Sequence, residues 1–145
     1  TRMDLSSCLS LTGLPESMGQ LTALTTLNLS YCRSLTGLPE SMGQLAALTR
    51  MDLSSCLSLT GLPESMGQLT ALTTLNLSYC GSLTALPESM GQLTALTKLY
   101  VSECDALPLA MRRLARGLVP TVTLEGCHRS CHCWLAPRQT ICQDR

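Results

Sequence analysis

The feature that most constrains this chain of 145 residues is an internal repeat with a period of 24. Residues 1–32 recur without a single change at 49–80, and equivalent leucines and cysteines return every 24 residues. One unit reads L-x-x-L-x-L-x-x-C-x-x-L-x-x-L-P-E-S-M-G-Q-L-x-x. A fixed period of about 20–50 residues is typical of repeat proteins, in which each unit packs against its neighbours. We therefore expect a stack of similar units.

Each unit contains two different patterns. In Leu27, Asn28 and Leu29 apolar and polar residues alternate with the period of a short strand. The segment 39–45, Pro-Glu-Ser-Met-Gly-Gln-Leu, begins with proline, which the first turn of a helix tolerates. Gly43 disfavours a long helix, because glycine is about 1 kcal/mol less favourable than alanine inside one. The unit is therefore predicted to hold one strand and one helical or 3₁₀ turn.

Stacking is also required by the size of the unit. A single unit has too few apolar side chains to offset the entropy of ordering 24 residues, so its neighbours must cover its leucines. The chain has no Phe, three Tyr and one Trp, so aromatic side chains cannot fill a thick globular core. Together these observations predict an α/β solenoid with a parallel sheet.

A degraded sixth copy ends the array. Val122 and Leu124 keep the spacing of a strand after a unit that is one residue short, so Val122 is expected beside Leu99. We assign residues 1–127 to a solenoid of about six repeats and residues 128–145 to an irregular tail rich in Cys and Arg. Because the pattern starts in the middle of a strand, we expect the array to be truncated at its N-terminus.

The spacing of these residues resembles the leucine-rich repeat family over residues 1 to about 127. Cysteine at the ninth position followed by x-x-L-x-x-L-P is most similar to intracellular plant-type disease-resistance proteins, which combine a nucleotide-binding domain with leucine-rich repeats, and to Ras-group repeat proteins. The resemblance implies a curved solenoid with single helical or 3₁₀ turns on its convex face and a concave sheet that binds a protein partner. It also implies a part in an intracellular immune or signalling receptor or scaffold.

The alternation within each strand predicts which residues face that partner. Arginines and aspartates recur together in every second strand and are expected to neutralise each other, which argues against a stripe of positive charge. Exposed tyrosines are favoured contacts because they offer a large area at low entropic cost. The candidate partner-binding residues of the concave face are Arg2, Asp4, Thr26, Asn28, Tyr31, Arg50, Asp52, Thr74, Asn76, Tyr79, Lys98, Tyr100 and Glu103.

The near-identity of the copies argues against an active site, because catalysis needs different groups that converge on one point. The repeats contain no phosphate-binding glycine loop, and their glutamates lie one per unit. We therefore expect no enzyme activity, no catalytic residues, no cofactor, no bound metal and no small-molecule substrate. The alternative is that the chain recognises substrates for a larger enzyme such as a ubiquitin ligase.

The net charge of zero is the sum of two parts of the chain that carry opposite net charges. The repeats up to Asp105 carry −4 and the remainder +4. Leu107, Met111, Leu114 and Leu118 have helical spacing, with arginines on the other side. We interpret this predicted helix as a polar cap on the solenoid, so no nucleic-acid partner is expected. No stretch approaches the roughly 18 apolar residues of a membrane span.

The nine cysteines form two groups. Those at the ninth position of each repeat are predicted to be buried thiols, because parallel side chains are badly placed to form disulfides. Free thiols favour a reducing, cytoplasmic location, although Asn28-Leu29-Ser30 and Asn76-Leu77-Ser78 match the glycosylation sequence. In the tail, residues 127–133 together with Cys142 leave three alternatives open, namely a zinc site, a disulfide or an irregular segment.

Overall fold

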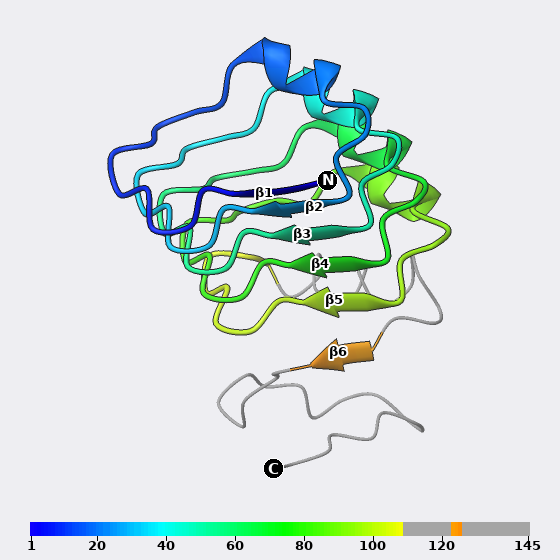
Figure 1. Ribbon diagram of the computed structural model, residues 1–145. Helices are drawn as coiled ribbons and strands as arrows, with labels where there is room; N and C mark the ends of the chain where they lie inside the picture. Colours follow the sequence, from blue (N-terminus) through cyan, green and yellow to red (C-terminus); the bar gives the residue numbers. More distant parts are fainter. Residues whose placement is uncertain (109–122, 126–145) are drawn as a thin grey trace, which may run out of the picture.

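The computed structural model describes residues 1–108 and 123–125. Each repeat contributes one strand of three residues and, in the first four repeats, one 3₁₀ turn of five residues (Figure 1). The strands are β1 (Arg2–Asp4), β2 (Thr26–Asn28), β3 (Arg50–Asp52), β4 (Thr74–Asn76), β5 (Lys98–Tyr100) and β6 (Thr123–Glu125). The turns are η1 (Glu16–Gln20), η2 (Glu40–Gln44), η3 (Glu64–Gln68) and η4 (Glu88–Gln92).

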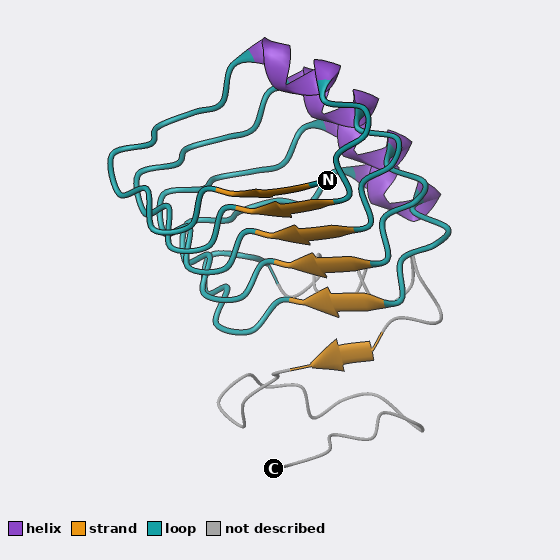
Figure 2. Ribbon diagram, viewed as in Figure 1, coloured by secondary structure: helices purple, strands orange, loops and turns teal. Residues whose placement is uncertain are grey.

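The strands form one parallel sheet in the order β1-β2-β3-β4-β5-β6. From β1 to β5 the register follows the repeat, so that Leu27 lies beside Met51 and Met51 beside Leu75. The 3₁₀ turns line up in a second row, away from the sheet, and long loops join the two rows (Figure 2). The predicted solenoid with a parallel sheet and single 3₁₀ turns is confirmed.

Backbone hydrogen bonds between neighbouring repeats continue beyond the ends of the strands. The amides of Leu29 and Tyr31 donate hydrogen bonds of 2.8 Å to the carbonyls of Asp52 and Ser54 in the next repeat. At the same point the Asn28 side chain accepts a hydrogen bond of 3.0 Å from the amide of Ser30. Local side-chain bonds of this kind favour turns. The same bond is made by the residue that ends each of the strands β1 to β4, and it favours the turn that ends the strand there.

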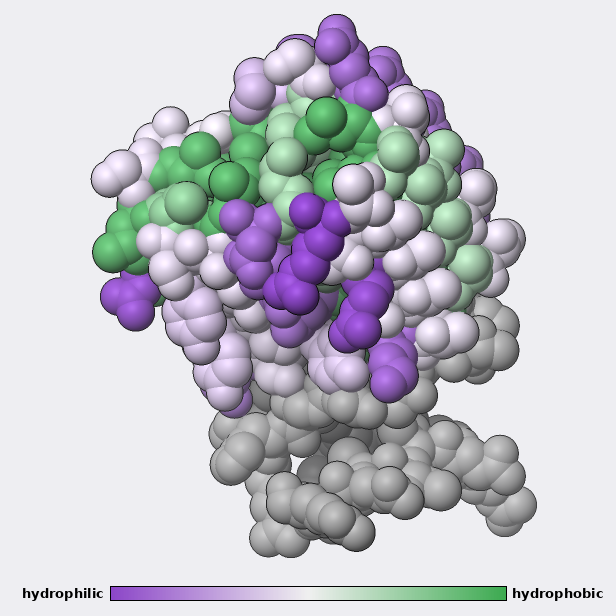
Figure 3. Space-filling view, in the orientation of Figure 1, coloured by the Kyte–Doolittle hydropathy of each residue, from purple (hydrophilic) through white to green (hydrophobic). Residues whose placement is uncertain are grey.

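The core is a column of aliphatic side chains enclosed by sheet, loops and turns. Leu27, Leu29 and Leu35 of the second repeat are fully buried, as are their equivalents in the third and fourth repeats. At the N-terminal end the equivalent side chains are only partly buried, because no repeat covers β1. Figure 3 shows the resulting apolar area beside β1. Burial thus depends on the neighbouring repeat, as expected for a solenoid.

The cysteines of the ninth position lie in this core. All five in the described residues are thiols rather than disulfides, and those at 32, 56, 80 and 104 are buried. Each of these four thiols donates to a carbonyl of the preceding repeat, and Cys56 reaches that of Leu29 at 3.2 Å. Burial raises the pKa of the Cys56 and Cys80 thiols to about 12. The prediction of buried thiols is therefore confirmed for these four positions.

The 3₁₀ turns pack closely against one another. A Cβ placed on Gly43 would lie 2.7 Å from the Ser65 carbonyl oxygen and 2.8 Å from the Ser65 Cβ, well inside van der Waals contact. Each turn is also joined to the next, because the Glu40 carboxylate accepts a hydrogen bond of 3.2 Å from the amide of Ser65. The regular spacing of the turns along the solenoid thus depends on a residue without a side chain.

One prediction about the sheet was wrong. Leu99 pairs with Leu124, two residues later than the expected Val122, and Tyr100 pairs with Glu125. A shift of two residues preserves the alternation of the two faces of a strand, so the apolar pattern alone does not distinguish the two registers. The predicted helix after Asp105 and the cysteine-rich tail lie outside the described residues.

Candidate partner-binding surface

The sheet carries a groove of about 500 Å³ on the face turned away from the core. It crosses the strands from β1 to β5, and its lining combines polar side chains with two apolar strand residues. The lining residues are Arg2, Thr26, Leu27, Asn28, Arg50, Met51, Asp52, Thr74, Asn76, Lys98 and Tyr100. Nine of the thirteen residues proposed from the sequence are among them. The shared register of the strands brings these nine together.

Charged side chains of the groove differ in their pairing. Arg2 and Asp4 form an ion pair with an N–O distance of 3.0 Å. Hydrogen bonds from the Ser6 hydroxyl and amide lower the pKa of Asp4 from 3.8 to about 2. Among the described residues, Arg50 forms no such pair, although it occupies the same place in an identical stretch of sequence. The expected neutralisation of arginine by aspartate is thus found in the first repeat and not in the third.

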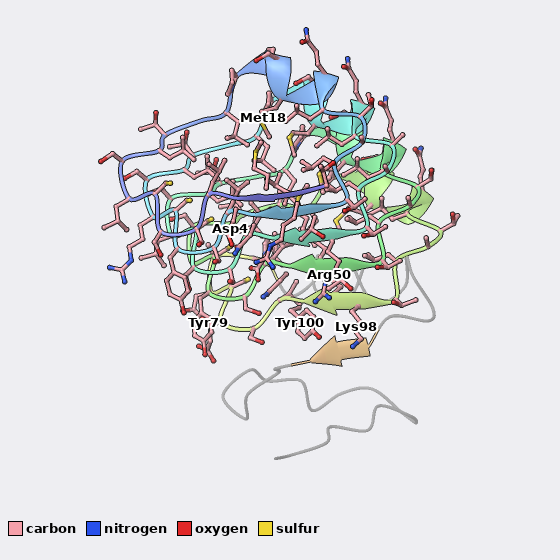
Figure 4. All side chains as sticks on the ribbon, in the orientation of Figure 1. Asp4, Met18, Arg50, Tyr79, Lys98 and Tyr100 are labelled. Carbon is pink, nitrogen blue, oxygen red and sulfur yellow. The ribbon has the colours of Figure 1, made fainter. Side chains whose placement is uncertain are left out.

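The remaining four candidates lie outside the groove lining. Asp4 ends β1, while Tyr31, Tyr79 and Glu103 follow the strands by three residues. All three of these latter residues adopt a left-handed backbone conformation, with φ between 53° and 62°. The side chains of Tyr31 and Tyr79 are 51% and 55% exposed. In Figure 4 Tyr79 lies beyond the ends of the strands, whereas Arg50, Lys98 and Tyr100 lie over them.

Sequence reasoning missed two exposed apolar side chains in the loops that follow the strands. Leu9 and Leu57, which occupy the position two residues after the tyrosine column, are 57% and 45% exposed. Their position in the repeat is variable, since Arg33 stands there in the second repeat and Gly81 in the fourth. That variability was the available signal, because positions that pack in the core keep an apolar residue in every copy.

No group of three or more His, Cys, Asp or Glu residues is placed to hold a metal ion in residues 1–108 and 123–125. None of the helical segments in the same part of the chain has the length and apolar character that a membrane span requires.

Comparison with known proteins identifies the repeat. The sequence profile described as Leucine Rich Repeat matches residues 23–45 and 71–93, each of which spans one strand and the following 3₁₀ turn. The chain contains leucine-rich repeats. The assignment to this family, expected from the spacing of leucines, is confirmed, whereas kinship with disease-resistance or Ras-group proteins stays a prediction.

Solved structures show the same fold in other leucine-rich-repeat proteins. The leucine-rich repeat domain of the type III effector XopL is 27% identical, with a TM-score of 0.59 over 69% of this chain and 37% of that chain. The protein LIC12759 of Leptospira interrogans is 24% identical, with a TM-score of 0.56 over 79% of this chain and 34% of that chain. This leucine-rich-repeat chain thus spans about a third of the length of either structure. Comparison with curated proteins gave no significant match.

Proposed function

We propose that this leucine-rich-repeat chain is a protein-interaction module that binds its partner through the groove on the concave sheet. Domains of this family typically mediate protein–protein interaction. The observation that carries the proposal is the groove itself, in which nine polar and charged candidates from five strands face one space. A rigid sheet holds these side chains in fixed positions, which favours recognition of a shaped surface.

The variation between repeats supports the same proposal. The aliphatic and cysteine positions of the core keep leucine, methionine, valine or cysteine in every described copy, whereas the groove positions change from Arg to Thr to Lys and from Asp to Asn to Tyr. The groove therefore presents a non-uniform surface although the scaffold beneath it is repetitive. We further propose an intracellular immune or signalling receptor as the larger protein, and a cytoplasmic location. The buried thiols support a reducing compartment.

A random peptide library displayed on phage tests the proposal and does not require that the partner be identified. Peptides selected on the wild-type chain are re-tested on Thr74→Trp, which fills the centre of the groove without adding charge, and on Gln68→Trp, which adds the same side chain to the exposed end of η3. We expect the first variant to lose binding at least 10-fold and the second to retain it. Loss confined to Gln68→Trp, or failure of the library to yield any binder, would contradict the proposal.

A further inference from the structure

The groove carries a positive charge although the described repeats are acidic. Residues 1–108 contain eight acids and four bases, and three of those bases, Arg2, Arg50 and Lys98, line the groove. Only two acids, Asp4 and Asp52, belong to strands β1–β5. The other six lie in the 3₁₀ turns or after β5. They are Glu16, Glu40, Glu64, Glu88, Glu103 and Asp105.

Two cations of the groove have no partner among the described residues. Arg2 is paired with Asp4, whereas Arg50 and Lys98 make neither an ion pair nor a side-chain hydrogen bond in residues 1–108 and 123–125. Both side chains are exposed. An exposed, unpaired guanidinium and an exposed, unpaired ammonium in the same groove favour an anionic ligand.

The sheet sets the distance between these two cations. Arg50 pairs with Thr74, and Thr74 pairs with Lys98, so the two cations occupy equivalent positions two strands apart. At about 4.8 Å per strand their Cα atoms are about 10 Å apart. Figure 4 shows both side chains over the sheet, with Tyr100 beside Lys98. Thr74, which is half-buried, lies between them and also lines the groove.

We infer that this part of the groove binds an extended acidic segment of the partner in which two carboxylates lie three residues apart. An extended chain of the polyproline II type has three residues per turn and advances about 3.1 Å per residue, so side chains three residues apart lie on the same side, about 9 Å apart, and match the two cations. The segment would run along the solenoid axis, across β3, β4 and β5. This inference rests on the proposed function, since it assumes that the partner occupies the groove.

The distribution of charge also directs such a segment to the sheet. The four exposed glutamates of η1 to η4 form an acidic row on the opposite side of the repeats. An acidic partner is repelled by this row and attracted by the groove, which raises the rate of productive encounter at low salt. Complementarity of charge therefore selects both the face and the chemistry of the ligand.

Three synthetic peptides with blocked termini test the inference. The first, acetyl-GSETSEGS-amide, carries glutamates three residues apart; the second, acetyl-GSEETSGS-amide, carries them side by side; the third replaces both by glutamine. Each is titrated into the ¹⁵N-labelled full chain at about 50 mM salt, where electrostatic screening is weak. We expect the first peptide to bind about 5-fold more tightly than the glutamine peptide, with the second in between.

Matched variants locate the site. Arg50→Gln and Lys98→Gln should each weaken binding of the first peptide about 2–5-fold, the range of an exposed ion pair. Arg33→Gln removes the same charge at an exposed position outside the groove and should leave binding unchanged. Equal binding of the glutamate and glutamine peptides would overturn the inference, as would an equal loss in Arg33→Gln, which indicates attraction to net charge alone.

The two proposals fail in different ways. If binding of the library-selected peptides is lost in Thr74→Trp but the glutamate spacing has no effect, the groove binds a partner of other chemistry and only the acidic segment is refuted. If binding of the selected peptides is unchanged in Thr74→Trp, the proposed function itself is refuted, and the acidic segment with it.

Discussion

The close packing of the 3₁₀ turns predicts that two glycines of the same repeat respond to alanine in opposite directions. In Gly43→Ala the new methyl group would lie 2.7 Å from the Ser65 carbonyl oxygen, so the adjoining turn must move by about 0.7 Å to restore ordinary contact. Around Gly37 nothing lies within 4 Å of the position of a Cβ. Neither glycine has a left-handed φ that would strain alanine for another reason.

The expected change in the free energy of unfolding follows from the space around each glycine. Replacing glycine by alanine stabilises a chain by about 0.4–1 kcal/mol through the unfolded state, and this contribution is the same for both variants. Forcing a methyl group into a packed contact costs about 1–3 kcal/mol. We therefore expect Gly37→Ala to be slightly more stable than the parent and Gly43→Ala to be about 1–3 kcal/mol less stable than Gly37→Ala.

Urea unfolding followed by circular dichroism measures both free energies of unfolding, with the slope used to check that the extent of unfolding is unchanged. Equal stability of the two alanine variants would show that the turns are not in close contact. It would refute the argument that this glycine sets the spacing between successive repeats.

Three further results are expected. Leu75→Asp places a carboxylate in a fully buried position and should abolish cooperative thermal unfolding. Asn76→Asp introduces the residue that the third repeat has at this half-exposed site, so it should melt like the parent. Similar melting of the two variants would show that the inward face of the strand has been assigned wrongly. Because burial raises the pKa of the Cys56 thiol from 9.0 to about 12, the unfolded chain loses this proton between those pH values while the folded chain keeps it, so stability falls as pH rises through this window. Urea melts at pH 8, 10 and 11 should show a shallower decline in Cys56→Ser, and an identical decline would contradict the assigned burial. The double variant Tyr31→Ala with Tyr79→Ala should keep the stability of the parent, since both side chains are half exposed. It should bind library-selected peptides more weakly than the parent. Unchanged binding in a direct titration would show that the two tyrosines do not contact the peptide and that the binding surface is limited to the groove.

The fold could be predicted from the sequence because identical copies leave little freedom. Apolar residues with two periods in one 24-residue unit require a strand and a turn, and only stacking buries them. The residues that share a column of the sheet follow directly from the period, as the pairing of Met51 with Leu27 and Leu75 shows. The strand register was therefore predicted correctly where the copies of the repeat are nearly identical.

The register of β6 could not be predicted, because the last copy has lost that regularity. Val122 and Leu124 both suit an inward position, and an alternating pattern does not choose between registers that differ by two residues. In this region the spacing of the degraded copy was the only guide, and it indicated the wrong residue.

Details of the candidate site also depend on packing that a one-dimensional pattern does not contain. Arg2 and Arg50 stand in identical stretches of sequence, yet of these two only Arg2 is paired with an aspartate; β1 has a neighbouring strand on one side and β3 on both. In the sequence Gly43 indicates only a residue that disfavours a long helix, whereas the structure shows that its lack of a Cβ permits contact with the next turn. That contact is a distance between repeats, which the pattern of one unit does not contain.

The most direct test of the central claim, that the partner occupies the groove of the sheet, is site-specific photo-cross-linking to a library-selected peptide. Tyr100→p-benzoylphenylalanine places the photoreactive group in the groove lining in place of a side chain that is already aromatic, and Gln68→p-benzoylphenylalanine places it on the exposed end of η3. The account predicts a covalent adduct, detected by mass spectrometry, from position 100 and none from position 68. An adduct from position 68 with none from position 100 would contradict it.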